Sequence, residues 1–185
     1  YMIDEYKNGR TPNPDVMCNK EVKFGAFFNW AKSRGADFVA TGHYAQNIFA
    51  GVPELRESAD KEKDQTYFLW TLTQEQLRHV LFPVGHLTKP EVRKLAKKCG
   101  LATAEKKDSQ GLCFIGKVDM KEFLSHYISA KPGKVLDEKG EVVGTHEGAV
   151  FYTIGQRHGF TVMNKTDHDA PLFVSKKDVH ANTLP

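Results

Sequence analysis

The first forty residues combine a helical and a strand-like pattern of hydrophobic positions. Between residues 21 and 34 the apolar side chains recur at helical spacing, at Phe24, Phe27, Phe28 and Ala31. This spacing predicts a helix with one buried face that ends at Gly35. Residues 37–41 form a short apolar run, which is typical of a buried strand in a parallel sheet. Ligands of open α/β sheets bind beyond such strand ends, so Gly42 and His43 lie where a ligand is expected, although a lone His there is also commonly structural.

The middle of the chain contains a hairpin pattern, a polar run and a helix-start signal. Residues 45–60 predict a loop or hairpin that turns at residues 51–53. The polar run at residues 60–67 is, by pattern alone, typical of a solvated face. Thr73 to Gln76 form a capping box, which predicts a helix through Val80.

A second capping box, from Thr88 to Glu91, opens the next predicted helix. Apolar residues follow at i, i+3, i+4 and i+7, namely Val92, Leu95, Ala96 and Cys99. This spacing predicts a buried face with Cys99 as a core thiol, and Gly100 ends the helix.

After about residue 118 the pattern changes to short alternating segments. We expect a short helix at residues 121–128, short strands with turns at 138–140 and 146–148, a glycine-punctuated loop at 152–159 and a last strand at 171–175. The sequence therefore predicts a domain over residues 1–119 with a parallel sheet, and a small, mainly β domain over residues 120–185.

The composition is that of an ordinary globular protein, with 40% hydrophobic and 26% charged residues and a net charge of +3. Three cysteines without a CxxC motif indicate neither a disulfide framework nor a zinc site, so we expect no protein-bound metal and a reducing, cytoplasmic compartment. No apolar run reaches the length of a membrane span, and we expect no membrane partner. The chain starts at Tyr1 without a methionine, so we expect a fragment.

Positive charge is concentrated between residues 89 and 107. Seven Lys or Arg residues stand there against two Glu residues. Such a segment is either a solvated helix face or a surface that contacts phosphates, and the pattern alone leaves both open.

Two cysteine-containing stretches are candidates for chemistry. Pro12 and Pro14 make residues 9–20 a stiff loop that leads into the first helix, with Asp15 as the expected N-cap and Cys18 in the first turn. The positive end of a helix dipole favours a thiolate, so this loop is a candidate catalytic element. A proline-rich turn with a capping aspartate and a small apolar residue explains the same pattern. Cys113, between two glycines, is by itself equally well a buried strand thiol.

Taken together, eight blocks of this chain resemble the tRNA-specific 2-thiouridylases, which convert the wobble uridine of certain tRNAs to 2-thiouridine. The blocks are residues 9–15, 18–20, 40–44, 63–67, 82–85, 107–111, 113–116 and 152–157. The resemblance implies an α/β fold, namely part of a parallel-sheet domain like the PP-loop ATP pyrophosphatases and adenine nucleotide alpha hydrolases. A small, mainly β central domain follows it in that family.

The resemblance also implies a role for individual residues. Cys113 resembles the cysteine that accepts sulfur as a persulfide, and Cys18 its partner nucleophile, with a possible transient Cys18–Cys113 disulfide. Asp15 resembles the general acid/base beside the target uracil, and Gly42 an ATP-pocket glycine. The remaining positions that resemble contacts to tRNA or its target base are Asn13, Pro14, His43, Lys63, Asp64 and Gln65.

The implied reaction is ATP-dependent. Mg-ATP adenylates the uracil C2 oxygen and sulfur then displaces AMP, with the sulfur supplied by a cysteine desulfurase or a sulfur-relay protein. The family's ATP-binding loop, of the Ser-Gly-Gly-Val-Asp-Ser type, is absent from these 185 residues. We expect that loop before Tyr1 and the family's C-terminal β-barrel after Pro185, so this fragment alone is expected to be inactive.

Two alternatives from other classes remain open on the sequence. One is a non-catalytic RNA-binding module that uses the basic face of residues 89–107. The other is a thiol redox switch in which Cys18 and Cys113 pair without nucleotide chemistry.

Overall fold

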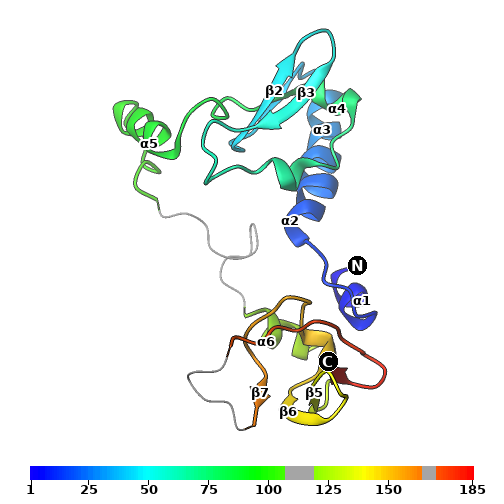
Figure 1. The fold of residues 1–185 in the computed structure, drawn as a ribbon. Helices are drawn as coiled ribbons and strands as arrows, with labels where there is room; N and C mark the ends of the chain where they lie inside the picture. The colour runs from blue at the N-terminus through cyan, green and yellow to red at the C-terminus, as the bar shows by residue number, and fades with distance from the viewer. Residues whose placement is uncertain (107–118, 164–169) are drawn as a thin grey trace. The chain divides into compact units, whose positions relative to one another are not determined.

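The computed structural model describes residues 1–106, 119–163 and 170–185, which form two compact units (Figure 1). One unit joins Tyr1–Pro12 to the described residues from Asp119 onward, and the other holds the described residues from Asn13 to Lys106. Cys113 lies outside the described residues.

A run of three helical segments opens the second of these units. It consists of α2 (Pro14–Met17), the π-helical segment η1 (Cys18–Phe27) and α3 (Phe28–Ser33), and Gly35 follows with a φ of +85°. Phe24, Phe28 and Ala31 are buried, which confirms most of the predicted face. The expectation for Phe27 is wrong, since this ring is 50% exposed and stacks on Trp30. A π-helix closes its hydrogen bonds at i→i+5, so positions spaced for an α-helix rotate out of line.

Strands of this unit form a parallel pair and a hairpin. Strand β1 (Val39–Ala40) pairs in parallel with β4 (Val80–Leu81), and β2 (Ala45–Phe49) pairs antiparallel with β3 (Pro53–Glu57). The buried strand and the hairpin were both predicted. Val80 was expected to end a helix, but α4 (Gln74–Leu77) stops earlier and Val80 pairs with Val39 instead. The side chain of Val80 joins the main core, which overrides the helical signal.

Both capping boxes are present, at the starts of α4 and of α5 (Lys89–Lys98). The short 3-10 helix η2 (Thr66–Leu69) precedes α4 and buries Leu69. The expectation of a buried face on α5 is wrong, because this helix buries no residue and Cys99 is exposed. None of the hydrophobic clusters among the described residues includes a residue of α5. Helical spacing creates an apolar stripe, but only a covering element buries it.

The other unit is mainly β. Its sheet has the strand order β7-β6-β5-β8, where β8 is parallel to β5 and the other neighbours are antiparallel. The strands are β5 (Gly133–Leu136), β6 (Val142–His146), β7 (Thr161–Val162) and β8 (Thr183–Leu184). Helix α1 (Met2–Lys7) packs with α6 (Met120–Ser125) through Tyr6 and Leu124, beside the short helix η3 (Ala149–Phe151).

The strand expected at residues 171–175 is not formed. Val174 is buried, and its backbone exchanges hydrogen bonds with the loop at Gly155 (N–O 2.7 Å) and Gln156 (N–O 3.0 Å). Because this loop turns, it cannot continue a strand ladder, so Val174 is buried while Leu172 and Phe173 beside it stay exposed. Among the described helices none is both long and apolar enough to span a membrane.

Gly85 holds the turn after β4 against the start of β2. Its N–H donates to the carbonyl of Phe82 and its carbonyl accepts from Ala59, while a Cβ at Gly85 would overlap the carbonyl oxygen of Ala45. We expect Gly85→Ala to lower the free energy of unfolding by at least about 2 kcal/mol.

The matched control is Gly42→Ala, because no described atom lies within 4 Å of a Cβ there and its φ is not positive. This variant should unfold within about 0.5 kcal/mol of the parent in urea. Equal stability of the two variants would show that the turn does not depend on close backbone approach.

Candidate functional site

Asn13, not Asp15, caps the helix that carries the first candidate cysteine. The Asn13 backbone is extended, and its Oδ1 accepts from the N–H groups of Asp15 and Val16, both at 3.1 Å. Pro14 takes the first helical position, where its missing N–H leaves no donor unsatisfied. The expectation that Asp15 is the N-cap is therefore wrong, since Pro14 starts the helix one residue before it.

Cys18 lies further along this helix than expected. With Pro14 as the first helical residue, Cys18 is the fifth, and its N–H already donates to the carbonyls of Pro14 and Asp15. The dipole effect falls off within the first turn, so the argument for a helix-terminal thiol does not hold at this position. Asp15 and Cys18 are nevertheless both half-buried and three residues apart, a spacing that places side chains on one helix face.

His43 is buried directly after strand β1. It is 7% exposed, and its imidazole lies 5.9 Å from the Phe24 ring and 6.0 Å from the Phe82 ring, measured between centroids. Nδ1 is 2.7 Å from the Thr41 hydroxyl and Nε2 is 3.4 Å from the Lys23 ammonium. An ammonium group only donates, so Nε2 accepts and Nδ1–H donates to Thr41.

The surroundings of His43 keep its ring neutral. Burial lowers the pKa of His43 to about 4, and the positive charge of Lys23 acts in the same direction. Lys23 and Thr41 are therefore part of this polar cluster, beyond the residues that the sequence predicted for it. The sequence carries no signal for Lys23, because its position depends on the π-helix, in which residues five apart lie on a similar face.

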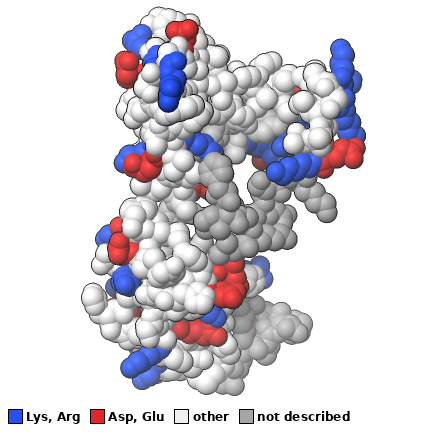
Figure 2. Space-filling model, turned by 180° about the vertical axis from the view of Figure 1, so that it is seen from behind, with Lys and Arg blue, Asp and Glu red and all other residues white. Residues whose placement is uncertain are grey.

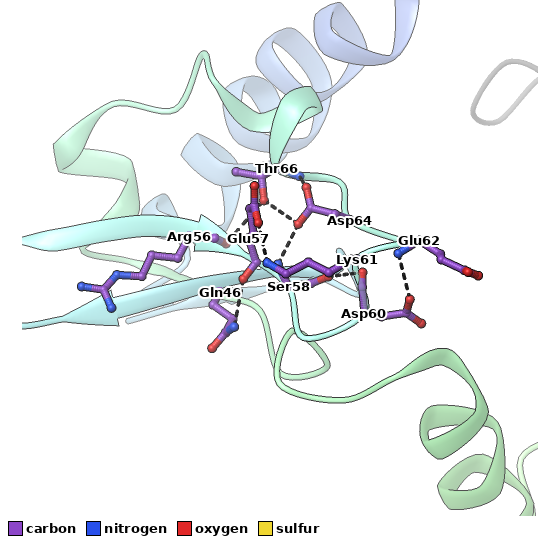
Figure 3. Close-up of polar contacts among 9 residues, drawn as sticks. All are labelled: Gln46, Arg56, Glu57, Ser58, Asp60, Lys61, Glu62, Asp64 and Thr66. Carbon is purple, nitrogen blue, oxygen red and sulfur yellow. Dashed lines mark hydrogen bonds and ion pairs between the residues drawn. The ribbon is translucent and has the colours of Figure 1, made fainter.

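The polar run at residues 60–67 is an ordered loop rather than only a solvated face (Figure 3). Oδ2 of Asp64 accepts from the buried Ser58 N–H at 2.6 Å and from the Thr66 hydroxyl at 2.9 Å, and Oδ1 accepts from the Thr66 N–H at 3.1 Å. Lys63, next to Asp64, is exposed.

Gln65 ties this loop to the end of β1. Its Oε1 accepts from the Tyr44 N–H at 3.0 Å, and its own N–H donates to the Tyr44 carbonyl at 2.8 Å. Asn19, beside Cys18, donates to the carbonyl of Phe68 at 3.0 Å. The structure thus brings the helix of Cys18, the strand end at His43 and the loop of Gln65 together within one unit.

The charged groups here suit the binding of a polar ligand at a strand end. Lys23 provides a cation, and Asp15 provides a carboxylate nearer the start of the same helical run. The described residues contain no group of three or more His, Cys, Asp or Glu side chains that could hold a metal ion.

Comparison with known proteins gives consistent matches over both units. Residues 1–117 match the family model described as tRNA methyl transferase HUP domain, and residues 121–185 match the tRNA methyl transferase PRC-barrel domain. The two models and the parallel β1–β4 pair confirm the predicted fold class, part of a PP-loop-type α/β domain followed by a mainly β domain.

The relatives carry one name. The chain is 54% identical to the tRNA-specific 2-thiouridylase MnmA of Lacticaseibacillus paracasei and 57% identical to those of Geobacillus thermodenitrificans and Listeria monocytogenes. Each match covers 100% of this chain and 49% of the relative. The chain thus spans about half the length of the curated relatives it matches.

His43 should make stability depend on pH. Its pKa is lower in the folded state than the ordinary value of about 6.5, so the unfolded state binds the proton more tightly. The contribution is complete above about pH 6.5 and is lost as the pH falls toward 4. Between pH 7.5 and 5 it amounts to about 2 kcal/mol.

Unfolding in urea at several pH values measures this contribution. His43→Asn should remove about 2 kcal/mol of the pH-dependent change, whereas the exposed control His158→Asn should retain the slope of the parent. An unchanged slope in His43→Asn would contradict a buried, neutral imidazole.

Asp64 and Lys63 should differ in their effect on stability. Asp64→Ala removes the acceptor of three hydrogen bonds, one of them from the buried Ser58 N–H, and should cost about 2 kcal/mol. Lys63→Ala, at an exposed side chain, should cost less than about 0.5 kcal/mol in the same urea titration. A neutral Asp64→Ala would show that the loop does not depend on this carboxylate.

Proposed function

The chain belongs to the family described as tRNA methyl transferase HUP domain. From that membership, and from its similarity to tRNA-specific 2-thiouridylases, we propose that it is part of an enzyme that thiolates the wobble uridine of tRNA at C2. The observation that carries this proposal is 54–57% identity along the whole chain, across both units. The cluster at the end of β1 adds support, because it is a polar site at the strand end where ligands of α/β sheets bind.

We assign the sulfur chemistry to Cys113 and Cys18. A cysteine desulfurase or relay protein loads Cys113 with a terminal sulfur as a persulfide. That sulfur attacks C2 of the adenylated uracil, and AMP leaves with the former C2 oxygen. The Cys18 thiolate then attacks Sγ of Cys113, which breaks the bond to the transferred sulfur, releases 2-thiouridine and leaves a Cys18–Cys113 disulfide. A thiol reductant regenerates both cysteines.

Asp15 acts as the general acid/base beside the uracil in this proposal. It shares a helix face with Cys18, so one element presents the proton-transfer group and the nucleophile. Asn13 and Pro14 complete the strip against the target base. The Asn13 cap uses Oδ1, so its Nδ2 is the group we assign to a uracil carbonyl.

ATP, with Mg²⁺, supplies the adenylation and is bound mainly by residues outside this chain. The residue we assign to its pocket here is Gly42, where the described residues leave space for a Cβ. A requirement for glycine at this position would therefore come from the nucleotide rather than from the fold. In this proposal residues 1–119 are the C-terminal part of the catalytic domain, and residues 120–185 are the small, mainly β central domain.

His43, Lys63, Asp64 and Gln65 are the remaining proposed contacts to tRNA. The structure favours an indirect role for Asp64 and Gln65, whose side chains hold their own loop. Lys63 is exposed next to them and is suited to contact a phosphate directly. His43 is buried, so it would position Lys23 and Thr41 at the tRNA-facing strand end.

Single-turnover transfer of labelled sulfur tests the proposal in a protein of the relatives' length that contains this chain. Cys113→Ser should fail to acquire label from the desulfurase. Cys18→Ser should acquire label on Cys113 and fail to release 2-thiouridine, and Asp15→Asn should slow release at least about a hundredfold. Gly42→Ala should raise the KM for ATP while its unfolding stays unchanged.

Other outcomes identify the other functional classes. tRNA binding with no persulfide on any cysteine would replace the proposal by a non-catalytic RNA-binding module. A reversible Cys18–Cys113 disulfide without dependence on ATP or tRNA would indicate a redox switch. Label on Cys18 in the Cys113→Ser variant would reverse the two cysteine roles.

A further inference from the structure

The excess positive charge of this chain lies in one segment of 18 residues. Residues 89–106 contain six Lys or Arg and two Glu, a net charge of +4, whereas the whole chain has a net charge of +3. The remainder of the chain is therefore slightly negative, at −1. An electrostatic attraction to a polyanion is strongest at α5 and the turn that follows it.

The cations of α5 form rows along the helix. Lys89, Arg93 and Lys97 follow one another at i, i+4 and i+8, and Lys94 and Lys98 form a parallel row. Residues four apart rise by about 6 Å along a helix, which is close to the separation of successive phosphates on a nucleic-acid strand. Figure 2 shows several Lys and Arg side chains gathered over this part of the molecule, with an acidic patch beside them.

A groove lies along this cationic face. It has a volume of about 370 Å³ and is lined by Pro90, Arg93, Lys94, Lys97, Ala104 and Glu105. The Arg93 guanidinium donates to the Lys106 carbonyl at 3.1 Å, and the Lys97 ammonium lies 2.8 Å from the Glu105 carboxylate. The contact with the carbonyl holds the Arg93 cation at the groove, which lowers the entropy lost when an anion binds.

Helix α5 starts beside the candidate site. The Lys89 N–H donates to Asp60 at 2.8 Å, and the Lys89 ammonium lies 5.3 Å from the centroid of the Tyr44 ring, the residue after His43. Glu91 is turned to the helix start, where it accepts from the N–H and the hydroxyl of Thr88, both at 2.7 Å. Because Glu91 faces the helix start, Glu105 is the acidic side chain that lines the groove. The rows of cations lead away from the candidate site.

We propose that the groove and rows of α5 bind the sugar-phosphate backbone of the tRNA substrate next to the modified nucleotide, without reading its sequence. This inference rests on the proposed function for the identity of the polyanion. Lys94, Lys97 and Lys98 contact phosphates, and Arg93 supports a bidentate contact at the groove. Such contacts hold the RNA in position, while the residues at the end of β1 select the base.

Glu105 limits this affinity. Its carboxylate forms an ion pair with the Lys97 ammonium. The hydrogen bond from Lys97 lowers the pKa of Glu105, so the side chain is ionised at neutral pH. An incoming phosphate has to displace Glu105 from Lys97 or accept its repulsion. Removal of the Glu105 charge should therefore strengthen tRNA binding, which a loss of folding cannot imitate.

The test measures the Kd for unmodified tRNA as a function of salt, with the 185-residue chain and with the longer protein. Lys94→Gln/Lys98→Gln keeps good helix-forming residues and should weaken binding roughly tenfold, with the salt slope reduced by about 1 for each lysine. Glu105→Gln should tighten binding about threefold. The control Lys139→Ala removes an exposed lysine from the other unit and should change neither value.

Each result decides the point. Reduced affinity and slope in the lysine double variant, with tighter binding by Glu105→Gln, supports the proposal. Unchanged tRNA binding in both variants overturns it while thiolation persists, so the failure differs from a failure of the proposed function. Binding to anionic vesicles is measured for the same variants. If the lysine double variant lost vesicle binding but kept tRNA binding, the helix would be assigned to a membrane surface, which would also overturn the proposal.

Discussion

A buried, neutral imidazole joins the parts of the candidate site. His43 lies at the end of β1, donates to Thr41 of the same segment and accepts from Lys23 of the π-helix η1. Its ring packs against Phe24 and Phe82, which contact each other and belong to the main core. Hydrophobic packing and polar positioning therefore meet in one side chain, so a change there affects both.

The π-helical segment explains how Lys23 reaches that position. π-Helices are rare overall, but those that occur are often found at functional sites, because they change which side chains share a face. In η1 the change moves Phe27 to the surface and places Lys23 at His43. The helix that begins at the Asn13 cap thus carries Asp15 and Cys18 near its start and the cation of the site one turn later.

Helix α5 uses the opposite principle, since its side chains are organised by charge rather than by burial. It is anchored at its start by the capping box and by Asp60, yet it buries no residue among the described ones. A helix stabilised at its end can present its whole length to a partner. The cation rows and the groove at Glu105 suit a partner that presents phosphate groups, such as an RNA backbone.

Much of this protein was determined by local sequence. The capping boxes at Thr73 and Thr88, the hairpin turn at Gly51 and the strand at Val39 follow from side-chain chemistry and from hydrophobic spacing that acts over a few residues. The blocks that resemble the 2-thiouridylases are equally local, so the sequence alone carries that resemblance.

Tertiary structure decided the features that depend on distant partners. Val80 became a strand because Val39 lay beside it, and Val174 stayed outside the sheet because its neighbour is the turn at Gly155. Cys99 is exposed because no described element covers α5. The contact of Lys23 with His43 depends on a π-helix that the local sequence does not predict. The spacing of apolar residues shows which face of a segment can be buried, but only the tertiary structure determines which faces are covered.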